Sequence, residues 1–154
     1  MVLNEGMEAD APGGNRPQPW PASIVVGIDG STTGWRAFSA ALGVANRYNA
    51  FVRACYVAHM PAAAEMGVFG VAVPPVLDEG EDLRDEVNKE LAEAGISGDF
   101  VLLKGDVAHE LEAVAENCRA DIIVVGRSQH PALHLGGVPR KLLALGHRPV
   151  LVVP

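Results

Sequence analysis

The chain is poor in the residues that mark several common classes of protein. Its two cysteines, Cys55 and Cys118, stand far apart in apolar runs and form no Cys-x-x-Cys pair. This pattern gives neither a disulfide framework nor a structural zinc site, so both thiols are expected to be buried. No apolar run approaches the roughly 20 residues that a membrane-spanning helix needs, and the N-terminus lacks the layout of a signal peptide. We therefore expect a cytoplasmic protein.

Basic residues are also scarce. The chain has 12 Lys and Arg against 19 Asp and Glu, which gives a net charge of −7. Nucleic-acid surfaces need clustered cations that neutralise phosphates, and the nearest approach to a cluster is Arg140, Lys141 and Arg148. Neither nucleic acid nor a membrane is therefore expected as a partner.

No complete set of catalytic or metal-binding residues stands in the sequence. Ser31 and Ser128 lack the Gly-x-Ser-x-Gly pattern of a nucleophile elbow. His130 and His134 are four residues apart, but a proline separates them and no third ligand is near. A phosphorelay receiver would need a second acidic residue beside Asp29 and a lysine after the last strand, and both are missing. We expect no enzyme and no metal.

Strand-like and helical patterns alternate once the N-terminal segment has ended. Residues 1–21, rich in proline and glycine, are expected to form a flexible tail, and residues 22–154 a single domain. Strands are predicted at 24–28, 51–58, 100–103, 122–125 and 150–153, and helices after residue 31 and at 82–94, 108–117 and 138–145. Continuous apolar strands are typical of sheets covered on both faces. The alternation predicts an α/β fold, with a doubly wound parallel sheet and helices on both faces.

One segment, residues 59–80, departs from this pattern. It carries several prolines and glycines, yet its apolar content is high for a solvated loop. Long connections in compact domains are commonly functional or mobile. We expect a flap over one end of the sheet or a contact with a partner, and an insertion without a role stays an alternative.

Two strand ends carry candidate ligand-binding residues. Ligands of open α/β sheets bind beyond the carboxyl ends of strands, where the strand order reverses. The first strand runs into Asp29-Gly30-Ser31 and the fourth into Gly126-Arg127, while Gly136-Gly137 precedes the last helix. A carboxylate accepts hydrogen bonds from adenine or ribose, and glycines let backbone N–H groups approach phosphate. A simple turn with a helix N-cap also explains Asp29-Gly30-Ser31, so that alternative stays open.

Taken together, these segments resemble the universal stress protein family. Residues 24–41, IVVGIDGSTTGWRAFSAA, are similar to the family's first strand and helix. Residues 105–126, GDVAHELEAVAENCRADIIVVG, are similar to its third crossover, with Val107 in the place of a proline, and the closing RPVLVVP resembles its terminal strand. The resemblance covers residues 23 to 154 and implies a stress-response regulatory protein.

The resemblance also implies a fold and a partner. The fold is the adenine nucleotide alpha hydrolase-like one, with five parallel strands in the order 3-2-1-4-5. The implied partner is a second copy of the chain, paired through the last strand at Val150, Leu151, Val152 and Val153. An apolar edge strand favours such pairing on its own account. A further protein partner, of unknown identity, fits an alternative function: an interaction module that acts through dimerisation and binds no nucleotide.

A nucleotide site between the first and fourth strands is implied as well, with ATP or AMP as its ligand. Its candidate residues are Ile28, Asp29, Val57, Val125, Gly126, Gly136, Gly137 and Val138, and candidate side-chain contacts to phosphate are Arg127, His130 and Arg140. ATP-binding members carry Gly-x2-Gly-x9-Gly-(Ser/Thr) after the fourth strand. Here Gln129 replaces the second glycine, Gly137 replaces the hydroxyl residue, and the loop is three residues shorter. We expect AMP, or another adenine ligand with fewer phosphates than ATP, to suit this degenerate, shortened loop better.

Overall fold

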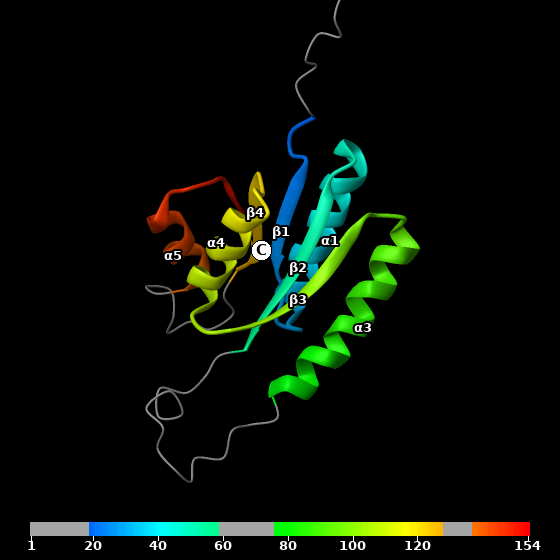
Figure 1. Cartoon of the computed structure of the whole chain (residues 1–154), viewed down its shortest axis with the longest axis horizontal. Coiled ribbons are helices and arrows are strands. Elements are labelled where there is room, and N and C mark those ends of the chain that lie inside the picture. The colour runs from blue at the N-terminus through cyan, green and yellow to red at the C-terminus, as the bar shows by residue number, and fades with distance from the viewer. Residues whose placement is uncertain (1–18, 59–75, 128–136) are drawn as a thin grey trace, which may run out of the picture.

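Five parallel strands form one sheet in the order β3-β2-β1-β4-β5 (Figure 1). The computed structural model describes residues 19–58, 76–127 and 137–154, without the side chains of residues 76–78. The strands are β1 (Ser23–Gly27), β2 (Phe51–Ala58), β3 (Gly98–Lys104), β4 (Ile122–Gly126) and β5 (Val150–Val153). The helices are α1 (Thr32–Tyr48), α3 (Val76–Ala94), α4 (Val107–Asn117) and α5 (Val138–Leu145). The expected fold class and strand order are confirmed.

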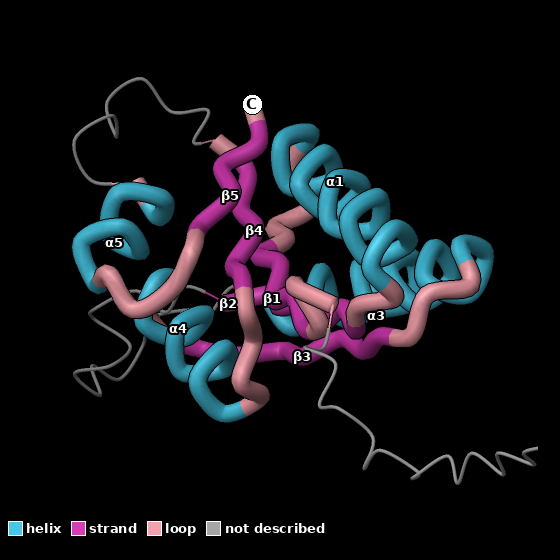
Figure 2. Tube along the Cα trace, turned by 90° about the horizontal axis from the view of Figure 1, so that it is seen from above, coloured by secondary structure: helices cyan, strands magenta, loops and turns pink. Residues whose placement is uncertain are grey.

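Helices cover both faces of the sheet. Figure 2 shows α1 and α3 on one face and α4 and α5 on the other. Successive residues of β1 point to opposite faces, so Ile24 and Val26 pack with Phe38 of α1, while Val25 packs with Leu111 of α4. Ile24, Val25 and Val26 are all 0% exposed. Burial on both faces explains why the strand is apolar throughout and does not alternate.

The largest difference from the expected elements lies at the start of α3. This helix begins at Val76, six residues before the expected residue 82, so the expectation of a loop up to residue 80 is wrong for its last five residues. Gly80 looks like a helix breaker in the sequence, but it is buried, and a Cβ there would stand 2.6 Å from Leu102 Cδ1. Gly80 therefore lets α3 approach the sheet closely. Residues 59–75, to which the expected flap or partner contact belongs, lie outside the described residues.

The ordered start of the domain is fixed just before β1. Residues 1–18 of the expected tail lie outside the described residues. Pro21 is buried, whereas Trp20 is 56% exposed. Asp121 Oδ2 accepts hydrogen bonds from the N–H groups of Ala22 at 2.7 Å and Ser23 at 3.1 Å. These bonds tie the chain to the turn ahead of β4 from Ala22 onward.

The two cysteines differ in burial. Cys55 is 1% exposed, and burial raises the pKa of its thiol to about 12. Cys118, at the end of α4, is only partly buried, so the expectation that both thiols are buried is wrong for this residue. Both thiols are free. Among the described helices, none combines the length and the apolar composition that crossing a membrane requires.

Candidate functional site

The turn after β1 is built around Asp29. Its Oδ1 atom accepts hydrogen bonds from the Ser31 N–H at 3.0 Å and from the Ser31 hydroxyl at 2.6 Å. Gly30 has a φ of +78°, a backbone conformation that glycine adopts without strain. The Ser31 Oγ atom then accepts the Gly34 N–H at 3.1 Å and caps α1. The turn and N-cap alternative is therefore correct, yet no hydrogen bond within the described part of the chain uses the second oxygen, Oδ2.

Gly126, at the end of β4, packs against the first turn of α1. A Cβ on Gly126 would stand 2.6 Å from the carbonyl carbon and oxygen of Thr33. A Cβ on Gly34 would in turn stand 2.5 Å from Asp29 Oδ1. β1 and β4 are parallel neighbours, with Val26 opposite Val124. The structure therefore brings Asp29 and Gly126 together, and we call this place, with Gly30 and the first turn of α1, the β1–β4 edge.

Three apolar candidates lie on two different faces of the sheet. Val125 is 4% exposed and belongs to the cluster under α4 and α5, whereas Ile28 is 3% exposed and belongs to the cluster under α1 and α3. The Ile28 N–H donates to the Cys55 carbonyl at 3.0 Å. Val57, near the end of β2, is half-buried and pairs with Leu103. Because its side chain is in the core, Ile28 has only backbone atoms to offer a ligand.

The amino end of α5 offers few hydrogen-bond donors. Gly137 is the N-cap and supplies no side-chain hydrogen bond, as its lack of a hydroxyl predicts. Pro139 has no N–H, and the N–H groups of Arg140 and Lys141 donate to the Gly137 carbonyl at 3.1 and 3.2 Å. Among the first residues of the helix, this leaves the N–H of Val138 for an anion.

Of the remaining residues expected to contact phosphate, the structure describes some and not others. Arg127 and Arg140 are both exposed, and the Arg127 N–H donates to the Val153 carbonyl at 2.7 Å. Val138 is half-buried against the α4 and α5 cluster. Gly136, His130 and Gln129, the residue that replaces a glycine of the family's ATP-binding pattern, lie outside the described residues. The structure thus describes the residues that are expected to contact adenosine. Of the loop that is expected to contact phosphate, it describes only the two ends, at Arg127 and at Gly137.

Asp106 joins the amino ends of α4 and α5. Its Oδ1 atom accepts the His109 N–H at 3.2 Å, which caps α4, and lies 2.8 Å from His109 Nδ1. Its Oδ2 atom accepts a hydrogen bond from Lys141 Nζ at 2.6 Å. Lys141, followed by His109, holds the pKa of the Asp106 carboxyl well below its usual range. The sequence gives no signal for this ion pair, because its partners are 35 residues apart.

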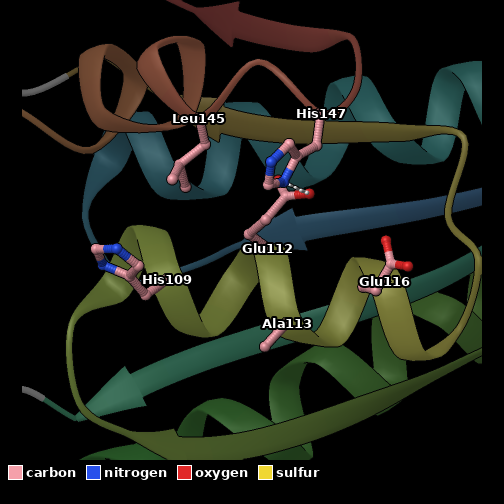
Figure 3. Close-up of a pocket in the computed structure, with 6 residues that line it drawn as sticks. All are labelled: His109, Glu112, Ala113, Glu116, Leu145 and His147. Atoms are coloured by element: carbon pink, nitrogen blue, oxygen red, sulfur yellow. Dashed lines mark ion pairs between the residues drawn. The ribbon is translucent and has the colours of Figure 1, made fainter.

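An open groove of about 500 Å³ lies between α4 and the end of α5, and none of the expected site residues lines it (Figure 3). It is lined by His109, Glu112, Ala113, Glu116, Leu145 and His147. Figure 3 shows the ion pair of His147 with Glu112, in which Nδ1 and Oε1 are 3.4 Å apart, while His109 lies at the other end of the groove. Within the described ranges, no group of three or more His, Cys, Asp or Glu is placed to hold a metal ion.

Charged residues of this groove are bound to Arg148, which ties α4 to the start of β5. The guanidinium donates to Glu112 Oε1 at 2.8 Å and to Glu116 Oε2 at 2.7 Å. It also donates to the carbonyl of Ala115, in the last turn of α4, at 3.1 Å and to that of Ala120, beyond the helix, at 2.9 Å. The side chains of Arg148 and Glu112 are 10% and 11% exposed. We therefore assign Arg148, Glu112 and Glu116 a structural role.

Comparison with known proteins agrees with this architecture. The sequence model of the universal stress protein family matches residues 22–154. A universal stress protein of Methanocaldococcus jannaschii is 30% identical over 136 residues, which are 84% of this chain and 80% of that protein. Among solved structures, a universal stress family protein from Burkholderia pseudomallei has a TM-score of 0.69 at 28% identity, covering 86% of this chain and 96% of that one.

A universal stress protein solved in complex with cAMP has a TM-score of 0.68 at 25% identity, again covering 86% of this chain and 96% of the other. The strand order and these matches together give the adenine nucleotide alpha hydrolase-like fold. The chain belongs to the universal stress protein family.

Proposed function

We propose that this chain is a cytoplasmic stress-response regulator that binds an adenine nucleotide at the β1–β4 edge and catalyses no reaction. The observation that carries the proposal is the meeting of Asp29 and Gly126 at the reversal of strand order, where ligands of such sheets bind. The similar protein solved with cAMP supports an adenine nucleotide as the ligand.

The residues at the edge suit the adenosine part of such a ligand. The Asp29 Oδ2 atom is an acceptor for an adenine amino group or a ribose hydroxyl. Gly126 has no side chain, so the end of β4 presents bare backbone. Val57, half-buried near the end of β2, supplies an apolar side chain, whereas Val125 is buried in the core and, like Ile28, offers only backbone atoms. A few fixed polar groups among apolar ones is the composition of small-molecule sites in general.

The surroundings of Asp29 support binding and not catalysis. An activated nucleophile pairs with a general base that a third group orients. The Ser31 hydroxyl donates to Asp29 at 2.6 Å, but the same two residues build the turn and the cap of α1, through the Ser31 N–H at 3.0 Å and the Gly34 N–H at 3.1 Å. We therefore assign Asp29 the role of a ligand acceptor and a turn residue.

Replacing Asp29 with asparagine separates these two roles. Asparagine keeps an oxygen in the position of Oδ1, so the turn persists, but it places an NH2 donor where the ligand needs an acceptor. Because a hydrogen bond to a charged group contributes about 1.5–3 kcal/mol, we expect the dissociation constant for AMP to rise about tenfold to a hundredfold. Isothermal titration calorimetry measures this change.

Ser31→Ala is the matched control for Asp29→Asn. It removes the cap and should cost about 1 kcal/mol of stability, but it keeps the Asp29 carboxylate. AMP affinity should therefore fall much less in Ser31→Ala than in Asp29→Asn. Equal affinity of Asp29→Asn and the unchanged chain would remove Asp29 from the site, and no AMP binding by the unchanged chain would refute the nucleotide proposal.

A second candidate function, a homodimeric interaction module, is favoured by the free side of β5. In the described sheet β5 is an edge strand, paired with β4 alone, and its Val152 is 37% exposed. An apolar edge with unpaired backbone groups favours pairing with another strand. We propose that two chains pair through β5, whether or not a nucleotide is bound.

A lysine at the edge tests this pairing. Unchanged protein should sediment at twice the chain mass of 16.2 kDa, and Val152→Lys should sediment as a monomer, because a charge on an edge strand opposes strand addition. Tyr48→Lys, at an exposed position of α1, should remain dimeric. A monomeric unchanged chain, or a dimeric Val152→Lys, would contradict the proposed interface.

A further inference from the structure

We infer that Tyr56, held by Glu79, makes the nucleotide site selective for a purine with an amino group, so that the site prefers AMP to inosine monophosphate (IMP). This inference rests on the proposed nucleotide function and deepens it by naming which part of the base is recognised. Tyr56 is assigned a contact with the base. Glu79 is assigned a positioning role, because it acts on the ligand through Tyr56.

Tyr56 lies on β2 beside the residues that lead into the β1–β4 edge. Gly27 of β1 pairs with Cys55 of β2, and the N–H of Ile28 donates to the Cys55 carbonyl at 3.0 Å. The next residue on β2 is Tyr56, and its side chain belongs to the same buried cluster as that of Ile28. Because Asp29 follows Ile28 directly, the backbone places Tyr56 next to the turn that carries the Asp29 carboxylate.

The ring of Tyr56 is held in place by the beginning of α3. Tyr56 is 7% exposed, and a Cβ on Gly80 would stand 3.2 Å from its Cδ1 atom, so α3 packs directly on the ring. Glu79, the residue before Gly80, is exposed. Burial raises the pKa of Tyr56, and the charges of Glu79 and Asp29, together with a hydrogen bond from the hydroxyl to Glu79, raise it further. The hydroxyl therefore lies near two carboxylates, one on α3 and one at the β1–β4 edge.

These contacts leave the Tyr56 hydroxyl as an acceptor for a ligand. A phenol has one proton, and here Glu79 accepts it, because a charged acceptor forms a stronger hydrogen bond than the neutral carbonyl of a base. The phenol oxygen keeps its lone pairs, and the Oδ2 atom of Asp29 is an acceptor as well. Tyr56 and Asp29 thus present two acceptors to a ligand and no proton.

The base is the part of the ligand that meets Tyr56. A planar base is the least polar part of a nucleotide and packs best on apolar side chains. Of the three apolar residues expected at the site, Ile28 and Val125 are buried in the core, whereas Val57 is half-buried near the end of β2. The base therefore finds its apolar contact at the end of β2, where Tyr56 is the preceding residue.

AMP and IMP distinguish this arrangement from others, because they differ only in the base. Position 6 carries an amino group in AMP and a carbonyl in IMP. The amino group can donate to Tyr56 and Asp29, whereas the carbonyl would leave both acceptors unpaired, which costs binding free energy. The ribose and the phosphate are identical in the two ligands, so effects of protein charge on them cancel in the ratio of the two affinities.

The test is the ratio of AMP affinity to IMP affinity, measured by calorimetry in the full chain. We expect the unchanged chain to favour AMP at least about tenfold. Tyr56→Phe keeps the ring but removes the acceptor, and Glu79→Met frees the hydroxyl proton to donate to the carbonyl of IMP. Each should lower the ratio about threefold to tenfold, the range for one neutral hydrogen bond. Adding Glu79→Met to Tyr56→Phe should lower it no further, because Glu79 acts through the hydroxyl.

Glu81→Met is the matched control, because it removes the same charge from α3 at an exposed residue that pairs with Arg84, and it should leave the ratio unchanged. AMP binding with no preference over IMP, or with a ratio that Tyr56→Phe or Glu79→Met leaves unchanged, would overturn the inference and keep the proposed function. An equal fall in Glu81→Met, or a further fall in the double variant, would do the same. Failure of the unchanged chain to bind either nucleotide would overturn both. Thermal unfolding of each variant confirms that the compared proteins are folded.

Discussion

Replacing Arg148 with methionine is expected to lower the free energy of unfolding by about 3–5 kcal/mol, the range for breaking a buried ion pair from one side. The Arg148 side chain is 10% exposed, and methionine can fill part of its space but donates no hydrogen bond. Glu112, 11% exposed, would lose its 2.8 Å bond to Arg148 Nε and keep only His147, whose Nδ1 lies 3.4 Å away. The carbonyls of Ala115 and Ala120 would also lose their shared donor.

Urea unfolding of three variants distinguishes this cause from a general loss of packing. Glu116 is 77% exposed, so Glu116→Gln should change stability by no more than about 1 kcal/mol. Arg148→Met combined with Glu112→Leu should recover much of the loss, because apolar residues can replace a buried pair together. A double variant as unstable as Arg148→Met would contradict the role of the stranded carboxylate.

Replacing Gly126 with alanine is expected to damage both the fold and the site. The new Cβ would stand 2.6 Å from the carbonyl carbon and oxygen of Thr33, and these backbone atoms cannot rotate aside as the end of a side chain can. The first turn of α1 must move, which should cost about 1–3 kcal/mol. Because Asp29 contacts the same turn, the affinity for AMP should fall about tenfold or more.

Gly43 provides a matched control for this substitution. It lies in the middle of α1, and a Cβ there would meet no atom within 4 Å. Gly43→Ala should therefore raise stability by about 0.5–1 kcal/mol and leave AMP binding as it is. Chemical unfolding and calorimetry of both variants give the comparison. A Gly126→Ala protein as stable as the unchanged chain would show that β4 and α1 are less closely packed than described.

Local sequence patterns were sufficient for most of the fold. Continuous apolar runs predicted all five strands, and the bounds of β2, β5 and α5 agree with those in the structure. Such runs are visible because burial on both faces removes the polar positions. The start of α3 could not be predicted in the same way. Gly80 signals a break in any local pattern, and only its contact with Leu102 of a later strand shows why a glycine is needed within the helix.

The candidate site was predictable where its residues follow a strand end. Asp29 and Gly126 could be named because Asp29 follows β1 and Gly126 ends β4, and the family resemblance implied that these two strands are neighbours, as the structure confirms. The pair of Asp106 with Lys141, and that of Arg148 with Glu112, join residues 35 and 36 positions apart. Their meeting depends on how α4, α5 and β5 pack, which no local pattern records.

The most direct test of the account is a titration of isotope-labelled protein with AMP, followed through the backbone amide signals in NMR spectra. We predict the largest shifts at Gly30, Ser31 and Gly126 of the β1–β4 edge and at Gly137, the N-cap of α5, with little change at Ala113 and Leu145 in the groove beside α4. Shifts centred on Ala113 and Leu145, or no shifts at saturating AMP, would contradict the assignment of the β1–β4 edge as the nucleotide site.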